Sequence, residues 1–169
     1  MTNETTIVPE TNESTALAIT KAPDLAQWEV EYALRQQREA EAFKPNKAVL
    51  LNALALTGIT HVVVSFDGCG DSGQIESVNA RSGEEEMKLP EAQIEMLRIL
   101  WGQAEPEREQ VTIATAIETL TYDVLELVHS GWENNDGAYG EINFDVEAHT
   151  ITLDYNERYT SSENYQHTF

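Results

Sequence analysis

The segment TIATAIETLTYDVLELVHSGW, residues 112–132, limits the possible folds more than any other part of the chain. Its apolar residues recur at helical spacing in one continuous stripe: Ile113, Ile117, Leu120, Val124, Leu127 and Val128. Such a stripe predicts an amphipathic helix with one buried face. Residues 141–159, EINFDVEAHTITLDYNERY, alternate apolar and polar side chains, which predicts two strands with one wet face. A helix followed by a half-exposed strand pair indicates an α+β fold.

A second strand pair is predicted earlier in the chain. HVVVSFDG, residues 61–68, is β-branched and aromatic, and QIESVNAR, residues 74–81, is extended in character after a glycine-rich turn. The predicted architecture is an antiparallel sheet of about four strands, arranged as two hairpins, with helices packed on one face. The other predicted helices span residues 23–43, residues 47–58 after a break at Pro45 with Asn46 as the cap, and residues 90–103. Residues 82–90 and 104–110 are predicted to be polar connections.

The chain is predicted to form one domain behind a leader. Residues 1–22 are rich in Thr, Asn, Glu and Ser and lack apolar periodicity, so we predict a disordered leader, followed by a single α+β domain over residues 23–169. No apolar run is long enough for a signal peptide or a membrane span, and we expect a cytoplasmic protein without a membrane partner. The single cysteine, Cys69, excludes an intramolecular disulfide and fits a reducing compartment.

The charge of the chain sets the class of partner that it can bind. The chain carries 30 acidic and 10 basic residues, a formal net charge of −20. From Gln110 to the C-terminus the chain contains eleven acidic residues and one basic residue, Arg158, for a net charge of −10. A surface of this kind repels nucleic acid and anionic membranes and attracts basic protein surfaces.

The turn SFDGCGDSGQ, residues 65–74, contains GDSG, the tetrapeptide around the nucleophile of chymotrypsin-like proteases. That motif has meaning only with a histidine base, an oxyanion hole and a two-barrel fold, which the predicted elements do not supply. We therefore interpret Ser72 as a turn residue and predict no catalytic residues. Cys69 lies between Asp67 and Asp71, whose charges disfavour a thiolate, so a nucleophilic cysteine is not expected either.

Two hypotheses follow for the polar segments. In the first, the chain is a non-enzymatic protein without a cofactor that binds a basic protein surface. Carboxylates on alternate strand positions lie about 7 Å apart, close to the spacing of phosphates, so a sharper version is a nucleic-acid mimic. The residues assigned to this surface are Glu141, Asp145, Asp154, Glu157, Trp132 and Tyr139. A simpler alternative is that the acids only keep the protein soluble.

The second hypothesis is a divalent-metal-binding enzyme or sensor. Its ligands for Ca²⁺ or Mg²⁺ would be acids on the two glycine-bearing loops: Asp67, Asp71, Glu133 and Asp136. His129 or Tyr139 would act as the proton-transfer group. The spacing does not match an EF-hand. A homodimer anchored by Trp28, Tyr32 and Leu34 is a further alternative.

The strings FDGCGDSGQIE, YDVLE, GWENNDGAYGEINFDV and ITLDYNERY resemble shared segments of a family of small uncharacterised bacterial proteins. That family occurs on proteobacterial chromosomes and plasmids and is grouped as a domain of unknown function. The resemblance covers about residues 45–169 and is more specific than GDSG alone. It implies a bacterial cytoplasmic protein or a mobile-element accessory factor, and it brings no activity, cofactor or catalytic residue.

Overall fold

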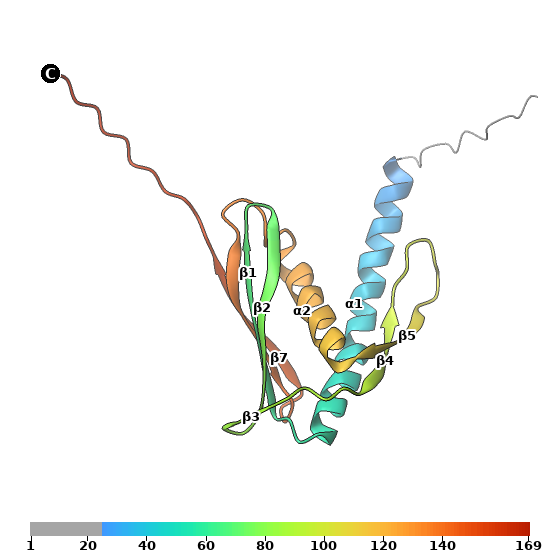
Figure 1. Ribbon diagram of the computed structural model, residues 1–169. Helices are drawn as coiled ribbons and strands as arrows, with labels where there is room; N and C mark the ends of the chain where they lie inside the picture. Colours follow the sequence, from blue (N-terminus) through green and yellow to red (C-terminus); the bar gives the residue numbers. More distant parts are fainter. Residues whose placement is uncertain (1–24) are drawn as a thin grey trace, which may run out of the picture.

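A computed structural model describes residues 25–169, so the leader predicted over residues 1–22 lies outside the described residues (Figure 1). The elements follow one another as α1 (Leu25–Leu56), β1 (His61–Cys69), β2 (Ser72–Ser82), β3 (Glu85–Met87), β4 (Gln93–Arg98), β5 (Glu107–Thr112), α2 (Ile113–His129), β6 (Ala138–Asp145) and β7 (Thr150–Glu157). The mixture of helices and antiparallel strands confirms the α+β class. No helix among residues 25–169 combines the length and apolarity needed to cross a membrane.

The main sheet has five strands, one more than predicted, in the order β3-β2-β1-β6-β7. Both predicted hairpins are present, β1–β2 and β6–β7, and β1 pairs antiparallel with β6 to join them. The additional strand, β3, comes from the segment predicted as a polar connection over residues 82–90. Its three residues extend the sheet at the β2 edge.

A second sheet is formed by β4 and β5, so β4 replaces the helix predicted over residues 90–103, and β5 begins within the segment predicted as a polar connection over residues 104–110. Ile94 and Leu97 suit a helical stripe, but Ile94 and Met96 also alternate with exposed Gln93 and Glu95, which is strand spacing. The partner strand is highly charged, and Arg98–Glu109 (3.1 Å) and Arg108–Glu95 ion pairs join the two strands. Tertiary pairing thus overrides the local helical pattern.

Helix α1 continues through Pro45, where the sequence predicts a break. Pro45 is exposed, so water can satisfy the carbonyl that loses its intrahelical donor. Asn46 is not a cap but a buried residue in the middle of the helix, 4% exposed. Its Nδ2 donates to Leu97 O (2.9 Å), and its Oδ1 accepts from Leu97 N (2.8 Å). Asn46 therefore ties α1 to the outer edge of β4.

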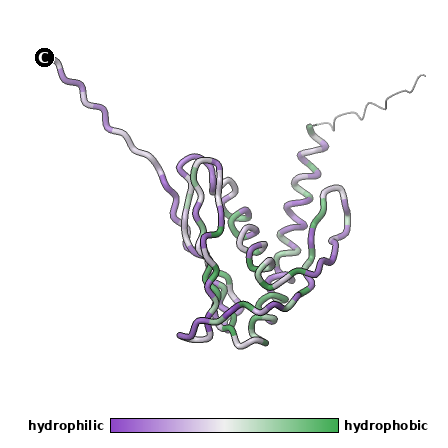
Figure 2. The backbone as a smooth tube through the Cα atoms, viewed as in Figure 1, coloured by the Kyte–Doolittle hydropathy of each residue, from purple (hydrophilic) through white to green (hydrophobic). Residues whose placement is uncertain are grey.

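The core lies between the helices and one face of the main sheet. Helix α2 begins where Thr112 Oγ1 accepts from Thr115 N (3.1 Å), and its buried residues Ile113, Ile117, Leu120 and Leu125 belong to the core. Leu127 and Val128, which the sequence places in the same stripe, are exposed. The C-terminal half of α1 closes the core from the side with Leu50, Leu51 and Leu54, all fully buried. Figure 2 shows hydrophobic segments gathered where the two helices meet the strands. The other face of the main sheet carries no helix (Figure 1).

Candidate functional site

The uncovered side of the main sheet, called the open face below, is polar and acidic. Strand register arranges its side chains in rows that cross the sheet. The successive rows are Arg81–His61–Asp145–Thr150, then Asn79–Val63–Asn143–Thr152, then Ser77–Ser65–Glu141–Asp154, then Gln74–Asp67–Tyr139–Asn156. Glu86 lies beside Arg81, and Glu76 occupies the bulge between β1 and β2. The open face therefore combines carboxylates, amides and hydroxyls around one exposed base, Arg81.

Two carboxylates on this face oppose one another directly. Glu141 and Asp154 are cross-strand partners, both are exposed, and neither forms an ion pair among residues 25–169. Like charges in this position destabilise a strand pair. Other surfaces are acidic too, but the acids of the β4–β5 hairpin and of α1 are partly neutralised by pairs such as Arg98–Glu109 and Arg35–Glu39. On the open face Asp67 is paired with Arg158 and Asp145 lies near His61, whereas Glu141 and Asp154 oppose one another without such a partner among residues 25–169.

A shallow polar depression of about 440 Å³ lies beside this pair. It is lined by His61, Val63, Asn79, Arg81, Gly83, Glu141 and Asn143. His61 Nε2 lies 3.8 Å from Asp145 Oδ2, and its Nδ1 lies 3.0 Å from Thr60 Oγ1. The depression therefore offers both hydrogen-bond donors and hydrogen-bond acceptors.

The two glycine-bearing loops meet at one end of the sheet, as the metal hypothesis requires. Gly70 N donates to Asn135 O (2.9 Å), and Asp71 N donates to Glu133 O (3.1 Å). Gly70 (φ 62°) and Asp71 (φ 66°) both have positive φ, so GDSG forms the tight hairpin turn predicted from the sequence. Ser72 begins β2 opposite Cys69, and its hydroxyl contacts no histidine within the described part of the chain.

Three of the four acids proposed as metal ligands are separately engaged by protein donors, whereas the Glu133 carboxylate forms no hydrogen bond or ion pair within residues 25–169. Arg158 binds the Asp67 carboxylate at 2.5 and 3.3 Å, and Asp71 Oδ1 accepts from Asn135 N (3.2 Å). Asp136 accepts from the backbone and the hydroxyl of Thr160. No three His, Cys, Asp or Glu side chains among residues 25–169 are grouped to hold a metal ion. The predicted ligands therefore brace the loops, and the geometry gives the metal hypothesis no support.

The two proton-transfer candidates also lie apart. His129 stacks on Tyr155 on the helix side of the sheet, with ring centroids 3.6 Å apart. Burial raises the pKa of Tyr155, and the charges of Glu157 and Glu133 add to the effect. Tyr139 lies on the open face, where Arg158 covers its ring at 4.5 Å. They therefore do not belong to one site.

Trp132, assigned from the sequence to the interaction surface, is buried and 8% exposed. Its ring packs edge-on against Phe66 and lies over two glycines of the β1–β2 hairpin. A side chain at Gly73 would overlap the Trp132 ring, which explains that glycine as a packing residue. Glu157 is exposed but opposes buried Ala138, so it projects from the helix side of the sheet. Tyr139, Glu141, Asp145 and Asp154 are the assigned residues that share the open face.

Arg158 holds the loops and three strands together, a role that the sequence interpretation missed. Its guanidinium donates to Gly68 O (2.9 Å) and Asp67, and its backbone N donates to Gly137 O (2.9 Å). The hydrogen bond to Asp67 raises the pKa of the guanidinium further. The available signal was that Arg158 is the single base between Gln110 and the C-terminus.

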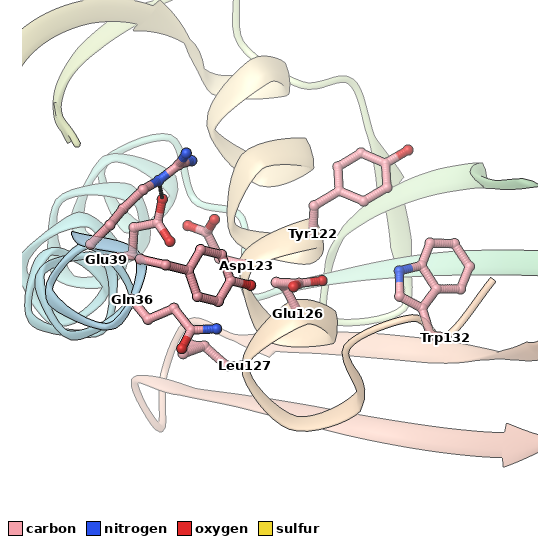
Figure 3. Close-up of a pocket in the computed structure, with 9 residues that line it drawn as sticks. Gln36, Glu39, Tyr122, Asp123, Glu126, Leu127 and Trp132 are labelled. Carbon is pink, nitrogen blue, oxygen red and sulfur yellow. Dashed lines mark hydrogen bonds and ion pairs between the residues drawn. The ribbon is translucent and has the colours of Figure 1, made fainter. Parts of the chain in front are cut away.

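A cleft of about 550 Å³ separates α1 from the C-terminal part of α2, and we call it the helix cleft. It is lined by Tyr32, Arg35, Gln36, Glu39, Tyr122, Asp123, Glu126, Leu127 and Trp132. Figure 3 shows Asp123 directed toward Glu39 across the gap between the helices. Burial, together with the charge of Glu39, raises the pKa of Asp123 to about 6. The sequence analysis assigned no role to Asp123.

A family model described as "Family of unknown function (DUF6878)" matches residues 42–169. The chain belongs to this family, which confirms the resemblance to an uncharacterised domain family and places its start close to the expected residue 45. No curated protein and no solved structure gives a significant match. The match begins at Ala42, which is also the first buried residue among the described side chains of α1.

Proposed function

We propose that this member of the family is a non-enzymatic acidic binding protein that recognises a basic protein surface through the open face of its main sheet. The observation that carries the proposal is the opposition of Glu141 and Asp154 without a neutralising base among the described residues. A chain that places like charges in register loses stability there, and a basic partner would convert this loss into binding energy.

The surrounding residues favour binding over solubility alone. Asn79, Asn143 and Thr152 form the row next to the acidic pair, and they can hydrogen-bond to a partner as well as to water. Tyr139 adds an exposed aromatic ring, a residue type enriched in interfaces. A surface that only maintained solubility would not need this concentration of amides and hydroxyls around carboxylates.

The sharper version of this proposal is a nucleic-acid mimic. Glu141 and Asp145 lie on one face of β6, and Asp154 lies beside them on β7. Because Asn143 stands between Glu141 and Asp145, these two carboxylates lie about 14 Å apart along the strand, about twice the spacing of successive phosphates, so they would mimic every second phosphate of a backbone. If the mimic version is right, a short DNA or RNA duplex will compete with this protein for its partner.

Affinity capture from the native host tests the proposal, with wild type compared with the double variant E141Q/D154N. A control variant, E107Q/E118Q, removes the same charge from exposed sites away from the open face. The partner is expected on wild type and on the control at about 50 mM salt, and to be lost from E141Q/D154N and from all three at about 500 mM. A partner retained equally by all three variants would place the interaction elsewhere.

A further inference from the structure

The N-terminal half of α1 carries large apolar side chains that the core does not use. Trp28 is 45% exposed and Tyr32 is 37% exposed, and no residue of α1 before Ala42 is classed as buried, Ala26 being outside the described side chains. The family match also begins at residue 42, so residues 25–41 precede both the family domain and its core. Exposed aromatic residues without a folding role are typical of a binding surface.

These aromatic residues are organised and lead into the helix cleft. Trp28 stacks on Tyr32 with ring centroids 5.2 Å apart and planes 10° apart, and Trp101 of the segment between β4 and β5 lies 6.4 Å from Trp28. Tyr32 forms part of the cleft wall. The exposed surface formed by the cleft and these aromatic side chains therefore extends along α1 beyond the cleft itself, and it is longer than a small-molecule site.

The cleft also contains polar groups without partners. Asp123 is partly buried and forms neither an ion pair nor a hydrogen bond within residues 25–169, while Arg35 is already bound to Glu39 at 2.6 Å. Trp132 is 8% exposed, and its indole nitrogen, which stays accessible to solvent, donates no hydrogen bond among those residues. In Figure 3 this nitrogen is on the side of the ring that faces Glu126. The cleft thus presents carboxylates together with donors, which include the Trp132 indole nitrogen, to an occupant.

We propose that the helix cleft binds a basic amphipathic α-helix of a partner protein. The apolar stripe of that helix packs on Tyr32 and Leu127, its Lys or Arg side chains pair with Asp123 and Glu126, and an acceptor on it receives the Trp132 N–H. An extended peptide would need free backbone groups from a strand edge, whereas the walls of the cleft are helices whose backbone groups are internally bonded. The backbone groups of a bound helix are already hydrogen-bonded within that helix, so they need no partners from the cleft.

The length and charge of the cleft agree with this occupant. The α1 wall from Trp28 to Glu39 rises about 16 Å, which matches about three turns of a docked helix. A second copy of this chain would bring further acids to a cleft that already holds Glu39, Asp123 and Glu126, so a basic helix is the complementary partner.

Fluorescence polarisation with a defined probe tests the inference. The probe is a labelled synthetic peptide of about 16 residues with Leu at i, i+3, i+4 and i+7 and Lys elsewhere, and the reference is a scrambled peptide of the same composition. Wild type is expected to bind the amphipathic peptide about tenfold more tightly than the scrambled one. Tyr32→Ala and Asp123→Asn are each expected to weaken binding about tenfold.

Matched control variants distinguish binding in the helix cleft from non-specific attraction between the basic peptide and an acidic protein. Leu34→Ala changes an equally exposed apolar residue that does not line the cleft, and Glu118→Gln removes an acid of α2 outside it. Both controls, and E141Q/D154N on the open face, are expected to change affinity less than about twofold. Equal binding of the two peptides, or unchanged affinity in Tyr32→Ala with a wild-type melting curve, overturns the inference. Self-association of wild type that Tyr32→Ala abolishes would assign the cleft to a second copy and overturn it as well.

Discussion

At the scale of single residues, the glycines of the loops act through close packing as well as through backbone freedom. Gly137 has φ 72°, and a side chain there would overlap the carbonyl of Gly68. Gly70 has a similar φ of 62°, but an added β-carbon meets nothing within 4 Å. These two positions separate the cost of the left-handed backbone from the cost of a steric clash.

Gly137→Ala is expected to destabilise the protein by more than about 3 kcal/mol, because the clash is with backbone that cannot move aside. Gly70→Ala should cost only about 1 kcal/mol, the ordinary penalty for a side chain at positive φ. Urea denaturation of both variants checks this difference. Equal losses at the two sites would show that the contact between Gly137 and Gly68 does not matter.

Asp123 should make stability depend on pH in an unusual direction. Its pKa of about 6 in the folded chain exceeds the ordinary 3.8, so between these values the folded state binds a proton that the unfolded state has released. The free energy of unfolding therefore falls as the pH rises from about 4 to about 6, by up to about 3 kcal/mol. Above pH 6 this contribution stays lost.

Asp123→Asn, which resembles the protonated acid, is therefore expected to be more stable than wild type at pH 7 and to lose this advantage toward pH 4. Denaturation curves measured at intervals between these pH values test the expectation. Glu118→Gln serves as the control, and its difference from wild type should not follow the same curve. A constant difference for Asp123→Asn would contradict a raised pKa.

At the scale of secondary-structure elements, two errors of sequence interpretation have one physical cause. Pro45 reads as a helix end, and residues 90–103 read as a helix, but the long-range pairing of Asn46 with β4 overrides both local signals. By contrast, α2 and the β6–β7 pair lie where the sequence predicts them, because their apolar periods are long. The predicted stripe of α2 is wrong at its C-terminal end, where Leu127 and Val128 are exposed and Leu125 is buried instead. Local patterns do not reveal which strand a single buried amide will meet.

Asn46→Ala is expected to destabilise the protein by about 2–4 kcal/mol, because it removes the partner of the partly buried Leu97 N–H and C=O groups. Asn52→Ala, at an exposed position of the same helix, should be neutral or slightly stabilising. Chemical denaturation of the two variants makes the comparison. If Asn46→Ala unfolds at the wild-type midpoint, Asn46 is not the link between α1 and β4.

At the scale of the whole molecule, the main sheet has one face packed against the helices and one face exposed to solvent. The two opposed carboxylates to which we assign the binding function, Glu141 and Asp154, lie on the exposed face. The alternation on β6 and β7 is predictable from the sequence, and so is the position of Glu141, Asp145 and Asp154 on the exposed face. The sequence could not predict that Trp132 turns inward over Gly73, or that Arg158 neutralises Asp67, since both depend on loops that meet only in the fold.

Neutralising the opposed pair should stabilise the isolated protein. Glu141→Gln is expected to raise the free energy of unfolding by about 0.5 kcal/mol at low salt, because it removes a like-charge contact with Asp154. The gain should shrink at about 1 M salt, where screening already weakens the repulsion. Thermal or urea unfolding at the two salt concentrations decides it, and a loss of stability would mean that Glu141 has a favourable contact instead.

The salt dependence of binding to the captured partner tests the central claim most directly. Affinity is measured at several salt concentrations for wild type, E141Q/D154N and the charge-matched E107Q/E118Q. We predict a steep loss of wild-type affinity with rising salt, a weaker and flatter dependence for E141Q/D154N, and wild-type behaviour for E107Q/E118Q. The same slope and affinity for wild type and E141Q/D154N would contradict binding through the open face.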